Sequence, residues 1–361
     1  MNAQRVIALL GRRDEPTDAL EEYCRFLGRA LAPHGYELER FRVSWAEEGW
    51  RAALQKLAVE AAGWRGCWVL MQYTALGWSR RGFPFAAPRV LYVLQRHGVR
   101  CGVVFHDTQP FWGGRIIDRA RRVCQRRIMQ RLQERAERVI LTVPAEKIRW
   151  LSAGLAKSVF IPVGANFLEP EADERTGSSR VKTVAVFCVT GSGRTLREIS
   201  DIACIVKRAA SNVGPLRLVV MGRGSKEAEP ALHAEFSGAD VDVTVLGLLS
   251  AEELARSLAS ADVLLFVRGQ VSTRRGSAIA GIAAGLPIVG YRGEETSFPV
   301  TEAGVLLAPS NDHEALSHEL TRVLSDDVLR RQLCERSRSA QRNYFSWDVI
   351  AAQYQKALEH V

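Results

Sequence analysis

The chain has 361 residues, which is too long for one ordinary α/β core and too short for three, so we expect two domains. Hydrophobic residues make up 47% of the sequence and charged residues 25%, and this composition excludes disordered and collagen-like chains. No apolar run approaches the length of a bilayer span, so we expect neither a transmembrane helix nor a signal peptide. The formal net charge of +9 favours anionic partners such as phosphates, acidic lipids or nucleic acid.

The cysteines indicate a reducing compartment, and we expect a cytoplasmic protein. They are odd in number, scattered, and never form a C-x-x-C pair, as expected of reduced thiols in a core. The seven are Cys24, Cys67, Cys101, Cys124, Cys188, Cys204 and Cys334.

Short apolar runs alternate with segments of helical period along the chain, which is typical of parallel sheets covered by helices on both faces. Two similar α/β units therefore follow one another. The first series of predicted strands covers residues 5–10, 38–43, 67–71, 101–105, 139–143 and 158–162. The second series covers residues 182–187, 216–221, 241–246, 262–267, 287–290 and 304–307.

The segment between the two series predicts a domain boundary. Residues 167–180 are rich in Glu, Pro, Gly and Ser and lack an apolar period. We therefore expect Rossmann-like domains over residues 1–166 and 181–345. Residues 346–361 carry apolar residues at helical spacing, and we expect this helix to return toward the first domain.

The most informative motif covers residues 271–289. Gly276 lets the backbone approach a ligand, and Ser277 begins a predicted helix whose free N–H groups and positive dipole end would face an anion. Arg274 and Arg275 add forked cationic donors, so the segment suits a pyrophosphate. The alternative is a small-residue helix preceded by two solvated arginines. The candidate donor-binding residues here are Ser272, Thr273, Arg274, Arg275, Gly276 and Ser277.

Three other landmarks accompany this motif in order along the chain. They are Phe105-His106-Asp107 after a predicted strand, the segment 160–166, and the segment 245–254 with the following Ala261-Asp262-Val263. Together with residues 271–289, they resemble the retaining glycosyltransferases of the family 4-like group. The resemblance implies a GT-B fold, in which two Rossmann-like domains with parallel sheets face a central cleft. It also implies a nucleotide-sugar donor, held mainly by the second domain, and transfer with retention at the anomeric carbon.

One departure from the family pattern concerns two glutamates, which members carry with seven residues between them. The matching positions are Ser272 and Ala280, and neither can act as a carboxylate. The resemblance assigns the second glutamate to the ribose hydroxyls, so we expect Glu294 or Glu295 in the next loop to replace it.

Further candidates follow other predicted strands. Arg194 lies in a glycine-rich loop that could cradle phosphate, Arg223 is a weaker candidate for the same site, and the resemblance places Leu248 near the base. His106, at the carboxyl end of a strand, is the candidate catalytic residue, and the resemblance implies that it contacts the donor sugar. The alternative for His106 is a packed, hydrogen-bonded core histidine.

Two loops of the first domain are candidates for the acceptor side. One contains Gly11, Arg12 and Arg13, and its alternative is an ordinary charged loop. The other covers residues 72–84 with Trp78, and its alternative is a packed loop anchored by aromatic side chains. We expect no metal or other cofactor, because Asp240-Val241-Asp242 begins a predicted strand and no zinc-ligand spacing occurs.

Residues 115–138 carry nine arginines on a helical pattern with interspersed apolar residues. Such a helix can lie on an anionic membrane surface at the inner face of the membrane. Alternatively, it packs within the first domain and exposes its arginines to water. No motif or stacking platform for nucleic acid accompanies the charge.

The resemblance, together with these residues, implies a glycosyltransferase that moves a hexosyl group from a UDP- or GDP-sugar to a glycan or lipid-linked acceptor. Two alternatives remain open. One is a nucleotide-sugar epimerase of the same architecture, and the other is an inactive binding or scaffold protein, which the absent glutamates favour.

Overall fold

The computed structural model divides the chain into two structural units. The first comprises Met1–Pro162 and Trp347–Val361, and the second comprises Val163–Ser346. The first unit thus ends before Asn166, and most of the predicted linker lies outside the described residues. The structure describes residues 3–151, 155–167, 181–189 and 195–359.

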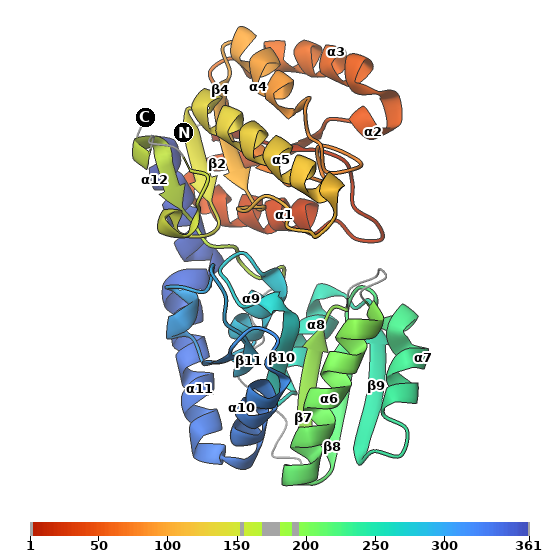
Figure 1. The fold of residues 1–361 in the computed structure, drawn as a ribbon. Helices are drawn as coiled ribbons and strands as arrows, with labels where there is room; N and C mark the ends of the chain where they lie inside the picture. Colours follow the sequence, from red (N-terminus) through yellow and green to blue (C-terminus); the bar gives the residue numbers. More distant parts are fainter. Residues whose placement is uncertain (1–2, 152–154, 168–180, 190–194, 360–361) are drawn as a thin grey trace. The chain divides into compact units, whose positions relative to one another are not determined.

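The described residues of the first unit form a six-stranded sheet in which every neighbouring pair is parallel (Figure 1). Its strands are β1 (Gln4–Leu10), β2 (Tyr36–Arg42), β3 (Trp68–Tyr73), β4 (Arg100–Phe105), β5 (Arg138–Leu141) and β6 (Ser158–Phe160). Their order is β2-β1-β3-β4-β5-β6, so the order reverses between β1 and β3. Every residue of β3 is buried, as expected of a strand covered on both faces.

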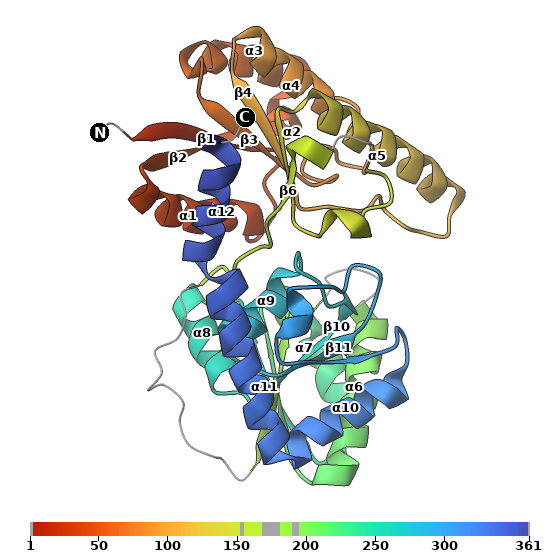
Figure 2. The same ribbon diagram turned by 90° about the vertical axis from the view of Figure 1, so that its left-hand side faces the viewer.

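Helices cover both faces of this sheet (Figure 2). On one face, α1 (Ala19–Leu31) packs against α12 (Trp347–Glu359). On the other, α3 (Trp50–Ala61), α4 (Ala87–Arg96) and α5 (Ile116–Arg135) pack side by side, with the short α2 (Trp45–Glu48) next to α3. The predicted arginine-rich helix therefore ends at Arg135, and Arg138 is a buried residue of β5.

The described residues of the second unit form another six-stranded parallel sheet. Its strands are β7 (Lys182–Phe187), β8 (Leu216–Met221), β9 (Val241–Gly247), β10 (Val263–Gln270), β11 (Ile288–Tyr291) and β12 (Val305–Ala308). The order is β12-β11-β10-β7-β8-β9, which is the order of a dinucleotide-binding Rossmann domain. The order reverses between β7 and β10, and ligands of such sheets bind outside the carboxyl ends of the strands at this point.

The helices of the second unit connect and cover these strands (Figure 1). They are α6 (Thr195–Val213), α7 (Ser225–Glu235), α8 (Ala251–Ala259), α9 (Gly276–Ala283), α10 (His313–Ser325) and α11 (Asp327–Ala340). Each strand predicted from the sequence is present in the two sheets, with small shifts at the strand ends.

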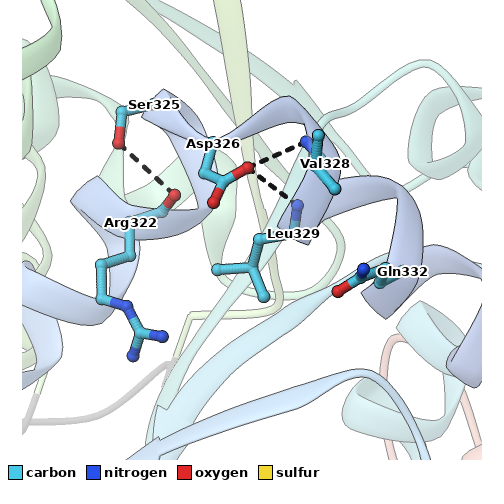
Figure 3. Close-up of a pocket in the computed structure, with 6 residues that line it drawn as sticks. All are labelled: Arg322, Ser325, Asp326, Val328, Leu329 and Gln332. Carbon is cyan, nitrogen blue, oxygen red and sulfur yellow. Dashed lines mark hydrogen bonds between the residues drawn. The ribbon is translucent and has the colours of Figure 1, made fainter.

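A surface hollow lies where α10 meets α11 (Figure 3). Asp326 caps α11 there, because its Oδ1 accepts hydrogen bonds from the backbone N–H groups of Val328 and Leu329 at 2.9 Å. Lys182, the first residue of β7, pairs with Asp327 at 3.2 Å, so this hollow lies at the amino ends of the strands. It is therefore remote from the edge where the β-to-α loops gather.

The last helix is an integral part of the first unit. Trp347 stacks on Phe26 with ring centroids 5.8 Å apart, and the hydroxyl groups of Tyr354 and Tyr23 are hydrogen-bonded at 3.0 Å within the core. The indole N–H of Trp68 donates to the carbonyl of Leu358 at 3.1 Å. The tail helix thus completes the face of the sheet that α1 begins.

Removing the Tyr354 side chain should destabilise the first unit. Tyr354 is fully buried, so Tyr354→Ala should cost about 3 to 5 kcal/mol, whereas Tyr354→Phe should cost only about 1 kcal/mol for one lost hydrogen bond. All eight tryptophans lie in the first unit, so tryptophan fluorescence during urea unfolding reports on it alone. Tyr344→Ala in the second unit is the matched control, and an equal effect there would contradict the assignment of α12.

Candidate functional site

The start of α9 lies at the carboxyl end of β10, beside the point where the strand order reverses. Arg275 is the residue before the helix, and no side chain caps this helix end. The N–H of Ala278 donates to the carbonyl of Arg275 at 2.9 Å, whereas the N–H groups of the first two residues of a helix have no acceptor within it and can bind an anion. Gly276 is exposed, and a Cβ built on it would have no atom within 4 Å, so the approach is open.

Small residues let α9 lie directly on the sheet. A Cβ built on Gly281 would lie 2.5 Å from Cδ2 of Leu264 in β10 and 3.3 Å from Cγ1 of Ile288 in β11. The described side chains of the helix are buried from Ala278 onward, while its first two residues reach the surface. The packing therefore fixes the position of the helix start relative to the strand ends.

A buried ion pair lies behind this helix start. Glu295 is 1% exposed, and its Oε2 accepts hydrogen bonds from Nε of Arg274 at 2.7 Å and from the hydroxyl of Ser272 at 3.5 Å. The backbone N–H of Glu295 donates to Gln270 Oε1 at 2.9 Å. The loop after β11 is thereby attached to the segment between β10 and α9. Thr273 is fully buried next to these groups.

Arg275 turns back toward the end of β10. Its Nη2 lies 3.5 Å from the position of a Cβ built on Gly269, which has a φ of +82°. The side chain is half-buried, as is that of Ser277, two residues later. Of the two arginines, Arg275 therefore lies at the helix start, and Arg274 is committed to Glu295.

The neighbouring strand ends bring Arg223 and Leu248 to the same edge. The carbonyl of Arg223 accepts a hydrogen bond from the N–H of Val189 at 3.0 Å, which joins the loops after β7 and β8. Gly222, with a φ of +88°, allows this approach, because a Cβ there would lie 2.7 Å from the ring of Phe187. Leu248 follows β9 and is 50% exposed. Arg194 lies outside the described residues.

The loop after β11 separates two neighbouring carboxylates. Glu294 is exposed, whereas Glu295 is buried in its ion pair with Arg274. The Oγ1 of Thr296 accepts from the N–H of Gly293 at 3.0 Å and donates to the carbonyl of Val271 at 2.7 Å, which fixes the loop. Only Glu294 of the two glutamates presents its carboxylate at the surface.

His106 follows β4 in the first unit. Its Nε2 is hydrogen-bonded to Oε1 of Gln72 at 2.9 Å, and the ring of Tyr23 packs edge-on against it at 5.1 Å. Burial lowers the pKa of His106 to about 4, so the imidazole is neutral at physiological pH. The neutral ring can exchange hydrogen bonds with a ligand without adding charge.

The loop after β1 and the loop after β3 meet at the reversal point of the first sheet. The N–H of Arg12 donates to the carbonyl of Gly77 at 2.7 Å, and a Cβ on Gly11 would lie 2.2 Å from the same oxygen. Arg42 supports the loop after β1, because it donates to the carbonyl of Gly11 at 2.8 Å and pairs with Asp18 at 3.0 Å.

Two of the acceptor-side candidates differ in exposure. Arg13 is exposed and pairs with Glu15 at 3.6 Å. Trp78 is fully buried: it stacks on Trp50 at 6.4 Å and donates its indole N–H to the carbonyl of Gln72 at 2.9 Å. Trp78 is therefore a packing residue. Its burial agrees with the alternative in which aromatic side chains anchor residues 72–84 as a packed loop.

The helix α5 presents two kinds of surface. Ile128 and Leu132 are buried against the unit, whereas Ile116, Ile117 and Val123 are 86%, 50% and 50% exposed among the arginines. No helix of the described residues is long and apolar enough to cross a membrane.

Comparison with known proteins identifies the second unit. Residues 187–326 match the family model of glycosyl transferases group 1, a stretch that begins at the end of β7 and contains α9. The chain carries a group 1 glycosyltransferase domain. The sequence matches none of the curated proteins.

Several solved structures share the fold of this chain over nearly its whole length. Sucrose-phosphate synthase from Thermosynechococcus elongatus has a TM-score of 0.72 at 18% identity, covering 99% of this chain and 98% of that one. HepE from Anabaena, in complex with UDP and glucose, has a TM-score of 0.69 at 14% identity, covering 99% and 100%. A protein from Listeria monocytogenes, named as a candidate UDP-N-acetylglucosamine 2-epimerase, has a TM-score of 0.64 at 12% identity, covering 99% and 96%. The fold is GT-B.

The sequence reasoning missed the supporting roles of Gln72 and Arg42, and it did not find the pairing of the candidate Glu295 with Arg274. Gln72 and Arg42 support His106 and the loop after β1, and the structure assigns Glu295 to Arg274 rather than to the surface. A usable signal existed for Gln72, because a lone polar residue in an otherwise apolar strand must find a buried partner. No comparable pattern marks Arg42 or Glu295.

The low pKa of His106 should make the stability of the protein sensitive to acid. The unfolded chain, with a histidine pKa near 6.5, binds more protons than the folded chain between about pH 6.5 and 4, so stability is lost as the pH falls through that range. The free energy of unfolding, measured with urea and tryptophan fluorescence, should fall between pH 7 and pH 5. His106→Asn should make this fall smaller by about 2 kcal/mol. A variant with the same pH dependence as the parent would show that His106 is not buried as a neutral group.

Proposed function

We propose that the chain transfers a hexosyl group from a UDP- or GDP-sugar to a glycan or lipid-linked acceptor, with retention. The observation that carries the proposal is the position of the open helix start of α9 within the stretch that matches the glycosyl transferases group 1 model. That stretch also contains Arg194, Arg223, Leu248 and Glu294, and the chain of HepE with the same fold was solved with UDP and glucose.

In this proposal the helix start binds the donor diphosphate. The proposed donors are the N–H groups of Gly276 and Ser277, the Ser277 hydroxyl and the Arg275 guanidinium, which belong to consecutive residues at this helix start. Preorganised donors of this kind stabilise the charge that develops on a departing nucleotide diphosphate, and they do so without a metal ion. We assign Arg194 and Arg223 to the same phosphate groups.

The remaining donor contacts follow from exposure and charge. Glu294 is the proposed partner of the ribose hydroxyls, because it is exposed while Glu295 is held by Arg274. Leu248 is the proposed contact of the base, and its exposed side chain suits an apolar face. His106 is the proposed contact of the sugar, as the family resemblance implies. Gly11, Arg12 and Arg13 remain the proposed acceptor side.

The fold alone does not separate transfer from epimerisation, because the Listeria protein, named as a candidate epimerase, shares it. The match to a glycosyltransferase family model favours transfer.

Turnover separates transfer from both alternatives. A panel of nucleotides and nucleotide sugars should first be screened for thermal stabilisation, since selective binding to the folded chain raises its melting temperature. Sugar release from the best donor then distinguishes an enzyme from a scaffold, and inversion of the donor sugar identifies an epimerase.

Arg275→Ala should weaken the binding of nucleoside diphosphate. The loss of one charge-assisted contact to phosphate costs roughly 1.5 to 3 kcal/mol, or about ten- to a hundredfold in Kd measured by calorimetric titration. Ser277→Ala should lose less, because the backbone N–H groups remain. Arg331→Ala, an exposed arginine near the start of α11, is the matched control. If Arg275→Ala and Ser277→Ala both bind UDP and GDP like the parent, the diphosphate lies elsewhere.

We also propose that the start of α5 associates with anionic membranes, where a lipid-linked acceptor would lie. Trp112 is 77% exposed and Ile116 is 86% exposed, next to exposed Arg115 and Arg119. Apolar side chains beside arginines match the chemistry of an acidic lipid surface.

Vesicle sedimentation tests this association. Binding to vesicles containing phosphatidylserine should exceed binding to neutral vesicles and should fall with added salt. Arg119→Glu should reduce it severalfold, whereas Arg331→Glu, with the same change in net charge, should not. Equal sedimentation with both kinds of vesicle would refute the electrostatic account.

A further inference from the structure

Gln72 is a buried amide whose orientation is set by its surroundings. It lies in β3 and is 1% exposed, and its Nε2 donates a hydrogen bond to the carbonyl of Leu70 at 3.1 Å. If the amide were reversed, its oxygen would face the carbonyl of Leu70, and both groups can only accept. The Oε1 of Gln72 therefore faces His106.

This orientation determines which ring nitrogen of His106 carries the proton. An amide oxygen only accepts, so the imidazole must donate to it from Nε2–H across the 2.9 Å contact. A neutral imidazole holds one proton, so Nδ1 is then unprotonated. No hydrogen bond joins Nδ1 to any residue that the structure describes, and the ring is half-buried rather than sealed.

We propose that Gln72 is a positioning residue that holds His106 in its Nε2–H tautomer and presents Nδ1 as a hydrogen-bond acceptor to a hydroxyl of the donor sugar. The tautomer follows from the contacts within the first unit, whereas the sugar hydroxyl rests on the proposed function. A hydroxyl is the suitable ligand group because it can donate to Nδ1, whereas a carboxylate or phosphate oxygen cannot.

The other groups around His106 do not compete for this role. The Tyr23 hydroxyl from α1 is hydrogen-bonded to Tyr354, and burial raises the pKa of both phenols, so they stay neutral. Tyr73 from β3 is also a buried phenol with a raised pKa, and Oδ2 of Asp107 accepts the N–H of Ala75 at 2.8 Å. Gln72 is thus the only described side chain hydrogen-bonded to the imidazole.

The tautomer can be read directly by long-range ¹H–¹⁵N NMR of the full chain with labelled histidine. His106→Asn assigns the signals by their loss among those of the seven histidines. At pH 7 we expect a protonated Nε2 and an unprotonated Nδ1. In Gln72→Met this pattern should give way to a tautomer mixture, whereas Gln133→Met, which removes another amide that is 1% exposed in the first unit, should preserve it. A protonated Nδ1 in the parent, or an unchanged pattern in Gln72→Met, would overturn the proposal.

Gln72→Glu provides a second, independent readout. A carboxylate facing Nε2 stabilises the imidazolium and raises the pKa of His106, so Nδ1 gains a proton and becomes a donor. The NMR titration midpoint of His106 should move upward, and kcat/KM should fall roughly two- to tenfold at neutral pH and recover as the pH rises. A residue that only fills space would leave the pH profile unmoved.

Titration with UDP-glucose and with UDP separates the two parts of the proposal. The Nδ1 signal of His106 should shift with UDP-glucose and not with UDP, because only the former carries the sugar. Equal shifts would reject the sugar contact. If neither molecule binds by calorimetry, the UDP arm of the proposed function fails, while the tautomer measured in the free protein still decides the role of Gln72.

Discussion

The parallel hydrogen-bonding of both sheets is the constraint on which the rest of the structure depends. Parallel strands need crossover connections, so every β-to-α loop of a unit leaves from the same edge of its sheet. Helices cover both faces, which leaves that edge as the place where polar side chains and backbone N–H groups can gather. Arg223, Leu248 and Arg275 are far apart in sequence, yet each follows a strand that ends there.

Behind these residues, each unit places a buried or partly buried polar side chain that holds a loop or a ring in one arrangement. Arg42 binds the loop after β1, Gln72 orients His106, and Glu295 joins the loop after β11 to the segment before α9. Such groups are costly to leave unpaired in the interior, so each strongly favours the one geometry that satisfies it. The two loops and the imidazole ring are therefore each held in place by such a contact.

The strands and the start of α9 could be predicted from the sequence, because apolar periodicity and the pattern of glycine, serine and arginine are local signals. The sequence was insufficient for Trp78 and for the choice between Glu294 and Glu295, since both depend on contacts between distant segments. Burial of Trp78 requires the stack with Trp50, and burial of Glu295 requires Arg274, 21 positions earlier. Neither pairing leaves a repeat or a spacing in the chain.

The surroundings of Ser272 explain why a glutamate would be unfavourable at this position. The Ser272 hydroxyl donates to Oε2 of Glu295, so a carboxylate still reaches this place, but from the loop after β11. That carboxylate also binds Arg274 at 2.7 Å, and the pair is nearly neutral as a unit. A buried glutamate at position 272 would set a second negative charge against Glu295, which one arginine could not balance. Ser272 instead leaves the buried pair with one negative and one positive charge, and its hydroxyl adds a hydrogen bond to the same carboxylate.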